Sequence, residues 1–334
     1  MSFKVIISGF GTVGQGVAEV LGRKRELVRE RFGKELSIVA AFDSRSLAFA
    51  PEGLDPSAIL ERKSSTGQVG EPRPKDMLDF LRKTDFDVLV EASPSNIEDG
   101  GEGLHFIREA LSKGVHVVTV NKGPLALHFR ELEQLAIDNG AMLRFEGSVG
   151  GAMPIINLCR ESLAGEEILS IQGIFNGTCN YILSRMDKGL PFDQALKEAQ
   201  ELGYAESDPS YDIDGIDSAS KVAILANAVF GRDVSFSDVS VTGVTAISEE
   251  AVSLAAGQKM VIRLIGEVSD SKLEVAPRLI PKGHPLALAG TLNIAQISSD
   301  LAGPVTVSGR GAGRIETASA IFSDLLAILE AQRQ

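Results

Sequence analysis

The chain is poor in the residues that build disulfide frameworks and zinc sites. Among its 334 residues there are only two cysteines, Cys159 and Cys179, and four histidines, which are scattered along the sequence. The two cysteines have neither the spacing of metal ligands nor the pattern of a disulfide framework. We therefore expect no zinc site and no fold that depends on disulfide bonds.

Long apolar runs and an excess of positive charge are missing as well. No apolar run is long enough to span a bilayer, and the N-terminus lacks the basic and apolar regions of a signal peptide. The net charge of −12 argues against a nucleic-acid partner and against an anionic membrane surface. An anionic cofactor can still bind, because backbone amides at a helix N-terminus attract phosphate locally. We expect a cytoplasmic protein that binds neither nucleic acid nor membrane.

Length and composition are those of a globular protein with roughly two domains. Hydrophobic residues make up 44% of the chain and charged residues 23%. In the first part of the chain, short β-branched strands alternate with helical segments, which is typical of βαβ units and of a parallel sheet covered on both faces. The predicted strands are Lys4–Ser8, Ser37–Phe42, Asp87–Glu91, Val115–Val120 and Met142–Glu146, the predicted helices are Val13–Arg31, Leu104–Lys113 and Gly123–Asn139, and residues 51–76 are predicted as a loop with a short helix.

The pattern changes after Gly150, where helices and strands no longer alternate regularly. The fold class we predict is α/β, with a Rossmann-type doubly wound parallel sheet and a second α+β domain. The first domain would comprise residues 1–150 and about 305–334, and the second residues 151–304. The later predicted elements are the helices Pro154–Leu163, Tyr181–Lys188, Phe192–Leu202, Ser218–Phe230 and Ile315–Leu329, the strand Ile168–Phe175, and further strands between Lys259 and Val307.

A glycine-rich turn directly after the first strand matches the dinucleotide-binding fingerprint G-x-G-x-x-G. The first glycine allows a tight turn, the second lets backbone approach a pyrophosphate, and the third allows close packing of helix on strand. The strand–turn–helix context favours a dinucleotide site over an ordinary glycine-rich turn. The predicted cofactor-binding residues here are Gly9, Phe10, Gly11, Thr12, Val13 and Gly14.

The end of the second strand carries two residues that bear on the choice of cofactor. Asp43 stands where a carboxylate would accept hydrogen bonds from the ribose 2′-hydroxyl of NAD. Arg45, two residues further on, could instead neutralise the 2′-phosphate of NADP. Both cofactors are compatible with this pair. Arg45 tips our prediction towards NADP, with NAD also accepted.

Residues 201–221 place six carboxylates ahead of a single lysine. A helix that begins near Asp217 would put Asp217 and Lys221 at positions i and i+4 on one face. An ammonium beside several carboxylates could hold an amino-acid substrate and move a proton. Taken alone, the segment also fits an acidic solvated loop followed by an ordinary surface ion pair.

Three further segments stand at a strand end or in glycine-rich loops. Lys122 follows the predicted strand Val115–Val120. Because ligands bind outside the carboxyl ends of the strands of an open parallel sheet, this position would bring Lys122 near the cofactor. A lysine after a strand is, however, often merely exposed to solvent. The loop from Glu146 to Pro154 joins one carboxylate to a glycine-rich backbone, which suits a hard cation or a hinge between domains. The glycines of residues 309–313 could approach the nicotinamide or simply turn the chain.

Together these segments resemble homoserine dehydrogenase along nearly the whole chain. The motifs that carry the resemblance are GFGTVGQGV, NKGP, EGSVGGAMPII, GIFNGTCNYIL, ELGYAESDPSYDIDGIDSASK and GRGAGRIETASAIFSDL. Two positions depart from the family pattern, because Val120 replaces an alanine and Cys179 replaces a threonine. Neither change removes a charged group. The chain is similar to the short form of the family, without a C-terminal regulatory domain.

The resemblance implies NAD(P)-dependent interconversion of L-homoserine and L-aspartate 4-semialdehyde, in the threonine and methionine branch of aspartate-family amino-acid biosynthesis. It also implies a homodimer whose second domain serves substrate binding and dimerisation. By position, Lys221 corresponds to the catalytic lysine, and Lys122 to a second active-site lysine that approaches the cofactor. The other matched residues are Glu206, Asp217 and Asp212 for the substrate, Ser93, Gly203 and Gly313 for the nicotinamide half of the cofactor, and Glu146, Val149, Gly151 and Met153 for a monovalent cation such as sodium.

The chemistry of the substrate agrees with this assignment. Homoserine has an ammonium, a carboxylate and a hydroxyl, which all need partners in a partly dry cleft. A carboxylate such as Glu206 can bind the ammonium, and a lysine can protonate the aldehyde oxygen during reduction. The sequence leaves open which of the two lysines transfers the proton. The alternatives are another nicotinamide-dependent dehydrogenase of amino-acid metabolism and a cofactor-binding regulatory protein, but the latter has no need of Lys122, Glu206, Asp217 and Lys221.

Overall fold

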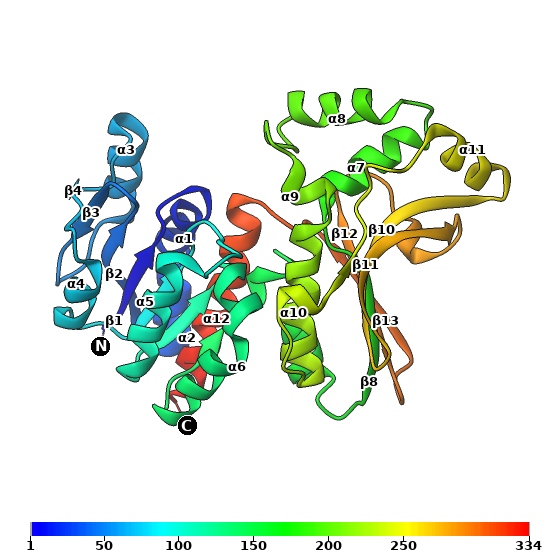
Figure 1. Ribbon diagram of the computed structural model, residues 1–334. Helices are drawn as coiled ribbons and strands as arrows, with labels where there is room; N and C mark the ends of the chain where they lie inside the picture. Colours follow the sequence, from blue (N-terminus) through cyan, green and yellow to red (C-terminus); the bar gives the residue numbers. More distant parts are fainter. Residues whose placement is uncertain (1, 334) are drawn as a thin grey trace. The chain divides into compact units, whose positions relative to one another are not determined.

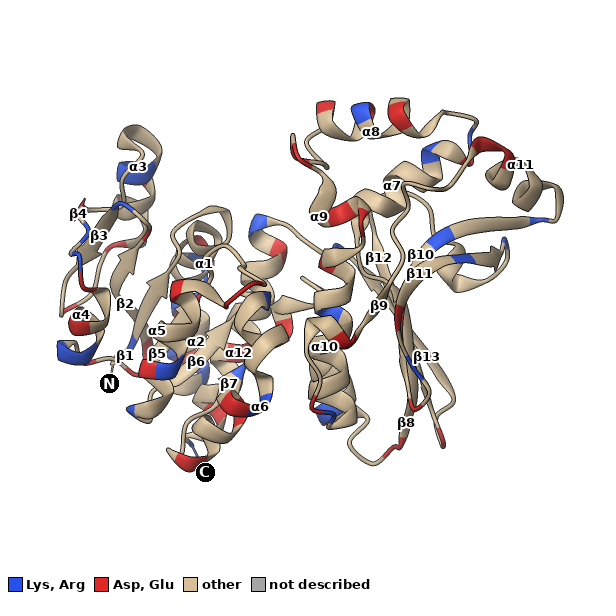
Figure 2. Cartoon of the chain, viewed as in Figure 1, with Lys and Arg blue, Asp and Glu red and all other residues tan. Residues whose placement is uncertain are grey.

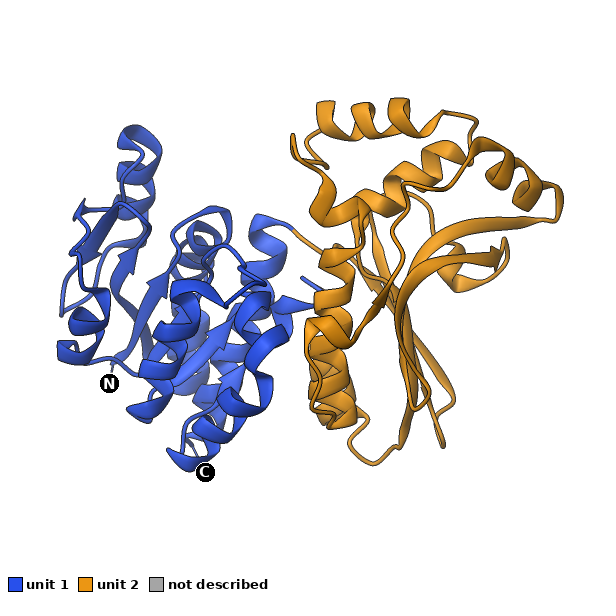
Figure 3. Ribbon diagram, viewed as in Figure 1, with its two compact units in different colours: residues 1–152, 313–334 blue, residues 153–312 orange. Residues whose placement is uncertain are grey.

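The computed structural model describes residues 2–333 of the chain, which folds into two compact units (Figure 3). Unit 1 comprises residues 1–152 and 313–334, and unit 2 comprises residues 153–312. The chain returns to unit 1 at residue 313 rather than near residue 305, because residues 304–309 form an edge strand of the unit 2 sheet.

Unit 1 is built on a seven-stranded sheet with the order β4-β3-β2-β1-β5-β6-β7 (Figure 1). Strands β2, β1, β5, β6 and β7 pair in parallel, whereas β3 and β4 are added antiparallel at one edge. The elements of unit 1 are β1 (Ser2–Ser8), α1 (Thr12–Arg23), α2 (Arg25–Phe32), β2 (Glu35–Phe42), β3 (Ser46–Phe49), α3 (Pro56–Thr66), β4 (Glu71–Pro72), α4 (Met77–Lys83), β5 (Val88–Glu91), α5 (Gly101–Ser112), β6 (His116–Thr119), α6 (Lys122–Asp138), β7 (Leu143–Arg144), η1 (Glu146–Ser148) and α12 (Arg314–Ala331).

Helices cover both faces of this sheet and enclose two separate apolar clusters. Successive residues of a strand point to opposite faces, so Val5 and Ile7 of β1 join one cluster and Ile6 joins the other. The first cluster is closed by α1 and α12, and the second by α4, α5 and α6. A sheet that is buried on both faces in this way confirms the predicted Rossmann-type fold class.

Two stretches of unit 1 differ in detail from the sequence prediction. Strand β3 pairs back onto β2 before the predicted loop begins. Residues 51–76 contain the predicted short helix, which is α3, and also the two-residue strand β4. Helix α3 begins where Asp55 accepts a hydrogen bond from the Ser57 amide (2.8 Å), with Pro56 at the first helical position, where its missing N–H is not needed. The predicted helix Val13–Arg31 is two helices, and the break at Lys24 lets the second one reach the first apolar cluster.

Unit 2 contains a six-stranded mixed sheet with the order β13-β12-β8-β10-β11-β9. All pairs are antiparallel except the short parallel pair β11–β9. This sheet is the predicted second α+β fold. The elements of unit 2 are η2 (Leu158–Ser162), β8 (Ile168–Ile174), α7 (Gly177–Met186), α8 (Phe192–Glu201), α9 (Ser210–Ile213), α10 (Ile216–Phe230), η3 (Phe236–Asp238), β9 (Ser240–Val241), α11 (Glu249–Gly257), β10 (Met260–Ser269), β11 (Lys272–Pro281), η4 (Pro285–Ala287), β12 (Asn293–Ser299) and β13 (Pro304–Gly309).

Helix α10 of unit 2, which carries Asp217 and Lys221, is deeply buried. Every residue from 217 to 228 is buried, and the helix contacts β10 and β11. A Cβ on Gly266 of β10 would lie 2.7–3.0 Å from atoms of the Phe175 ring and the Val222 side chain, so this glycine lets α10 approach the sheet closely. The helix therefore carries any polar residue on it into the interior.

Among the described residues, no helix is long and apolar enough to cross a membrane.

Candidate active site

The glycine-rich turn after β1 has the backbone that the fingerprint requires. Gly9 has φ +88°, in the left-handed region that favours glycine, and a Cβ there would collide with the Ala92–Ser93 peptide. A Cβ on Gly14 would collide with the carbonyl oxygen of Gly9. These two glycines are thus needed for backbone conformation and for close packing, as in dinucleotide-binding turns generally.

Gly11 differs from these two, because a Cβ at this position would meet no atom within 4 Å. It is the N-cap residue of α1, and no described side chain caps this helix end. A helix N-terminus with open space and uncapped amides fits a pyrophosphate. Thr12 is exposed and Val13 is half-buried at this end, whereas Phe10 is fully buried and anchors the turn.

The Asp43 carboxylate is held within its own turn. One of its oxygens accepts hydrogen bonds from the amides of Arg45 and Ser46, both 2.8 Å, and the other accepts from the Lys63 ammonium at 2.6 Å. Burial on its own would raise the pKa of Asp43, but the Lys63 hydrogen bond and the two backbone amides outweigh it and hold that pKa below its ordinary value. The negative charge at the end of β2 is therefore already neutralised by a lysine.

Basic side chains gather at this edge of unit 1. Arg45 is exposed, Lys63 of α3 pairs with Asp43, and the Arg73 guanidinium lies 5.8 Å from the Phe42 ring centroid. Figure 2 shows basic segments on α3 and around β3 and β4. Lys63 is a residue that the sequence analysis missed, because it follows Asp43 by twenty positions with no local pattern to connect the two.

The ends of β5 and β6 are joined by a buried polar network. The amide of Ser93 lies 3.2 and 3.3 Å from the two carboxyl oxygens of Glu91, and the Ser93 hydroxyl also donates to Glu91. The side-chain amide of Asn121 donates to the Ser93 hydroxyl at 3.2 Å. Burial raises the pKa of Glu91 to about 7, because hydrogen bonds from Ser93 and Asn121 only partly offset the loss of solvation.

Lys122 is the first residue of α6, directly beyond this network. The Asn121 side chain caps the helix by accepting a hydrogen bond from the Gly123 amide (3.2 Å). The backbone amide of Lys122 donates to the Ser95 hydroxyl at 3.0 Å. Ser93 and Lys122, both half-buried, therefore come to the same carboxyl edge of the parallel sheet as the Gly9 turn, where ligands bind in such folds.

In unit 2 the structure brings Asp217 and Lys221 together on one face of α10. The Lys221 ammonium lies 2.7 Å from the Asp217 carboxylate, and their side chains are 8% and 9% exposed. The ammonium also donates to the backbone carbonyl of Phe175 at 2.6 Å. The pair is thus a buried ion pair with an additional hydrogen bond, and the surface ion pair considered from the sequence is excluded.

Asp212 joins this group through Asn176. The side-chain amide of Asn176 donates to Asp212 at 2.6 Å and to Asp217 at 3.0 Å, while its oxygen caps α7 through the Cys179 amide. Burial raises the pKa of Asp212 above its ordinary value, and the negative charge of Asp217 acts in the same direction, against the hydrogen bond from Asn176. Two carboxylates therefore share one amide beside the lysine.

Asn293 of β12 also supports the lysine, although the sequence analysis did not single it out. Its side-chain amide donates to the Phe175 carbonyl at 2.9 Å, which is the carbonyl that Lys221 contacts. A Cβ on Gly311 would collide with the Asn293 side chain. The glycine-rich segment before α12 therefore needs a residue without a side chain at position 311. No sequence pattern connects residues 118 positions apart.

Two predicted residues of unit 2 lie outside this buried group. Glu206 is exposed in the loop between α8 and α9, and in the described chain it forms no ion pair and no hydrogen bond with Asp212, Asp217 or Lys221. Gly203 is exposed and has φ +75°. Its conformation requires a glycine, but no atom lies within 4 Å of a Cβ at this position.

The predicted cation loop, residues 146–153, contains one buried carboxylate and one glycine with a positive φ, and Gly313 is a second glycine with a positive φ. Glu146 is 3% exposed, Val149 is fully buried, and Gly151 has φ +59°; Met153 is buried at the start of unit 2. The described residues hold no cluster of three or more His, Cys, Asp or Glu side chains that could bind a metal. A cation here would therefore need backbone carbonyls, which are hard-cation ligands. Gly313 has φ +142° and is the N-cap residue of α12.

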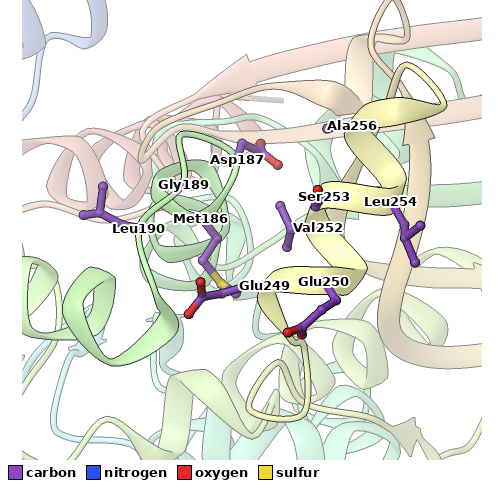
Figure 4. A pocket seen from close by; sticks show the side chains of 10 residues that line it. All are labelled: Met186, Asp187, Gly189, Leu190, Glu249, Glu250, Val252, Ser253, Leu254 and Ala256. Carbon is purple, nitrogen blue, oxygen red and sulfur yellow. The ribbon is translucent and has the colours of Figure 1, made fainter.

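A cavity of about 670 Å³ in unit 2 is lined by residues of α7, of α11 and of the segment that follows α7 (Figure 4). It contains no predicted site residue and no lysine or arginine in its lining, and its Asp187 pairs with the fully buried Arg263 at 2.8 Å. It therefore has no charge that would attract an anionic cofactor. Its lining residues are Met186, Asp187, Gly189, Leu190, Glu249, Glu250, Val252, Ser253, Leu254 and Ala256.

Family comparisons cover both units. The model described as homoserine dehydrogenase matches residues 154–326, and the model described as the homoserine dehydrogenase NAD-binding domain matches residues 9–146. The chain is 48% identical to a homoserine dehydrogenase from Methanocaldococcus jannaschii over 99% of either chain. It is 37% identical to an NAD(+)-dependent homoserine dehydrogenase from Pseudomonas canavaninivorans, over 98% of this chain and 96% of the relative.

Solved structures agree with these relatives. The crystal structure of a homoserine dehydrogenase from Thiobacillus denitrificans is 35% identical, with a TM-score of 0.87, over 100% of this chain and 74% of that one. A hyperthermophilic archaeal homoserine dehydrogenase in complex with NADPH is 32% identical, with a TM-score of 0.86, over 98% of this chain and 97% of that one.

Replacing Glu91 by glutamine should remove a pH dependence of stability. Because the pKa of Glu91 is raised from 4.5 to about 7, the folded chain binds a proton there more tightly than the unfolded chain does. The contribution of Glu91 to the free energy of unfolding should therefore fall as the pH rises from 4.5 through 7, by roughly 3 kcal/mol in total, and change little at higher pH.

Urea unfolding followed by circular dichroism, from below pH 4.5 to above pH 7, measures this effect. The difference between wild type and Glu91→Gln should change across that range and be constant above it. Curves that stay parallel throughout would contradict the raised pKa.

Proposed function

The chain belongs to the homoserine dehydrogenase family, and on this premise we propose that the buried Asp217–Lys221 pair is the reacting centre of the enzyme. The enzyme interconverts L-homoserine and L-aspartate 4-semialdehyde with NAD(P), in the threonine and methionine branch of amino-acid biosynthesis. The observation that carries the proposal is the 2.7 Å ion pair, which holds an ammonium in a site that excludes most solvent.

Lys221 is arranged to meet the oxygen that changes between alcohol and aldehyde. An ammonium has three N–H donors, and two of them have acceptors in the described chain, Asp217 and the Phe175 carbonyl. The third can donate to the substrate oxygen, stabilise it as negative charge develops during reduction and transfer a proton to it. The bound nicotinamide supplies or accepts the hydride. Lys122 is the second candidate for the proton transfer, because it stands at the strand edge where the cofactor binds.

The ammonium of the substrate needs a carboxylate partner, for which we propose Glu206 and Asp212. Glu206 is exposed and has no ion-pair partner in the described chain. Its carboxylate is therefore available to form an ion pair with the substrate ammonium. Asp212 is held by Asn176 next to the ion pair. Asp217 already binds Lys221. It would orient the lysine and also contact the substrate, because both side chains lie on the same face of α10.

For the cofactor we propose binding to the Gly9–Gly14 turn with a preference for NADP over NAD. The pairing of Asp43 with Lys63 supports this choice, because a neutralised carboxylate repels a 2′-phosphate much less than a free one. The exposed Arg45 guanidinium can then form a charge-assisted contact with the phosphate. The residues proposed for the nicotinamide half are Ser93, Lys122, Gly203 and Gly313.

Three further parts of the sequence prediction stay proposals. The Glu146–Met153 loop would bind a monovalent cation through the Glu146 carboxylate and backbone carbonyls, which is a donor set that suits a hard ion. Unit 2 would serve substrate binding and formation of a homodimer, and unit 1 with α12 would bind the cofactor. A cytoplasmic location is the third.

Turnover and its loss on replacing Lys221 test the proposed reacting centre. Wild-type protein should oxidise reduced nicotinamide cofactor only when L-aspartate 4-semialdehyde is added. Lys221→Ala should lower kcat by roughly 10²–10⁴, the range for a positioned acid or base. Glu206→Ala should mainly raise KM for homoserine, because an ammonium partner acts in ground and transition states alike.

Lys197→Ala is the matched control, because Lys197 forms an i,i+4 pair with Glu201 but is 77% exposed. It should leave kcat and KM unchanged. A near-normal kcat in Lys221→Ala would indicate that Lys122, and not Lys221, donates the proton. No turnover by folded wild-type protein with either cofactor would refute the assignment altogether.

The cofactor preference is tested by comparing kcat/KM for NADP and NAD. Wild type should favour NADP, and Arg45→Ala should reduce the NADP-to-NAD ratio by roughly tenfold or more, the loss of one charge-assisted hydrogen bond. Lys63→Ala should reduce the ratio as well, because it leaves the Asp43 carboxylate uncompensated. A wild-type preference for NAD, or a ratio that neither substitution alters, would show that this turn does not read the 2′ position.

A further inference from the structure

The carboxyl group of Glu91 is fully buried in unit 1, and the proposed reaction gives it no part. Glu91 is 0% exposed, and in the described chain it has no basic partner. A buried acid without a counter-charge is costly to the fold. What it does have is hydrogen bonds, from the amide and hydroxyl of Ser93 and from the side chain of Asn121.

Three ligand-facing segments meet at this carboxyl group. The Ala92–Ser93 peptide, which Glu91 holds, lies directly against Gly9, so that the phosphate turn rests on it. Asn121 connects the Ser93 hydroxyl to the start of α6, because its amide nitrogen donates to Ser93 and its oxygen caps the helix at Gly123. The segments after β1, β5 and β6 are thus linked through one side chain.

Helix α5 closes the network from behind. A Cβ on Gly103 would lie 2.7 Å from the amide nitrogen of Asn121 and 2.8 Å from a carboxyl oxygen of Glu91. The bare backbone at Gly103 therefore lets the helix pack closely against both side chains. Close packing of this kind fixes a geometry as well as stabilising it.

We propose that Glu91 is a positioning residue of the cofactor site, which fixes Ser93 and, through Asn121, the start of α6 that carries Lys122. The inference rests on the proposed cofactor site in unit 1 and deepens it. Glu91 accepts hydrogen bonds from the amide and the hydroxyl of Ser93, and that hydroxyl accepts one from Asn121. Removing the carboxyl group therefore leaves the two Ser93 donors without their acceptor and frees the backbone next to Gly9. Misplacement of groups around a reacting centre by about 1 Å lowers rates by up to roughly 10²-fold.

The test compares Glu91→Leu, which has similar bulk and no acceptor, with Glu91→Gln, which keeps one acceptor oxygen. Thr84→Val is the matched control, because Thr84 is a buried hydroxyl of unit 1 that donates to the Phe80 carbonyl before β5 begins. For each variant we would measure Tm, the dissociation constant of NADPH from its fluorescence, kcat, and KM for homoserine.

Glu91→Leu should weaken NADPH binding or lower kcat by roughly 10–10²-fold, with little change in KM for homoserine, because the Asp212–Asp217 group lies in the other unit. Glu91→Gln should restore both quantities to within about threefold of wild type. Thr84→Val should lower Tm alone. If Glu91→Leu also lowers only Tm, the carboxyl group is merely structural and the proposal is wrong.

Gly103→Ala covers the case in which Glu91→Leu does not fold. Its methyl group would displace the Asn121 and Glu91 side chains without removing either, and it should weaken NADPH binding or lower kcat about tenfold; wild-type values would overturn the proposal. Wild-type protein that binds neither NADPH nor NADH would refute the proposed function as well. Normal turnover by wild type together with normal Glu91 and Gly103 variants would refute only the inference about Glu91.

Discussion

The site in unit 2 depends on one interaction, the contact of a buried lysine with a buried aspartate. Moving both charges out of water costs several kcal/mol each, and only good geometry with further hydrogen bonds makes such a pair tolerable. Here the further bonds come from the Phe175 carbonyl to the ammonium and from the Asn176 amide to the carboxylate. The arrangement fixes the ammonium in a dry environment, where in the proposed reaction its charge would act on a substrate oxygen more strongly than in water.

Unit 1 handles charge by a different means, since the ligand expected there is an anion. The N-terminus of α1 offers backbone amides beside a glycine with free space around it, so the protein with its net charge of −12 needs no cluster of lysines to bind a pyrophosphate. Basic side chains are concentrated instead at the end of β2, where Lys63 neutralises Asp43. Each unit therefore has, at its proposed site, a pair of side chains of opposite charge: Asp43 with Lys63 in unit 1, and Asp217 with Lys221 in unit 2.

The sequence predicted the parts of the molecule that depend on local pattern. Periodicity and the glycine fingerprint indicated the Rossmann-type unit, and the spacing of Asp217 and Lys221 indicated that they share a helix face, which α10 provides. It could not predict how deeply α10 is buried, because that depends on Gly266 in a strand that follows much later. Lys63 and Asn293 were missed for the same reason, since each acts through a partner that no local pattern connects to it. Glu91 has a local partner in Ser93, but the burial of its carboxyl group and its link to Asn121 depend on tertiary packing. The break at Lys24 and the strand β3 follow from tertiary packing, which overrides local helix or loop preference.

The most direct test of the central claim is a structure of the protein with L-homoserine and an oxidised or reduced nicotinamide cofactor bound. The hydroxyl oxygen of homoserine should lie within hydrogen-bond distance of the Lys221 ammonium, roughly 2.7–3.2 Å, while that ammonium keeps its contact with Asp217. The nicotinamide should lie at the strand edge formed by the Gly9 turn, Ser93 and Lys122. A substrate hydroxyl bound away from Lys221, with the Asp217–Lys221 pair left without a ligand, would contradict the account.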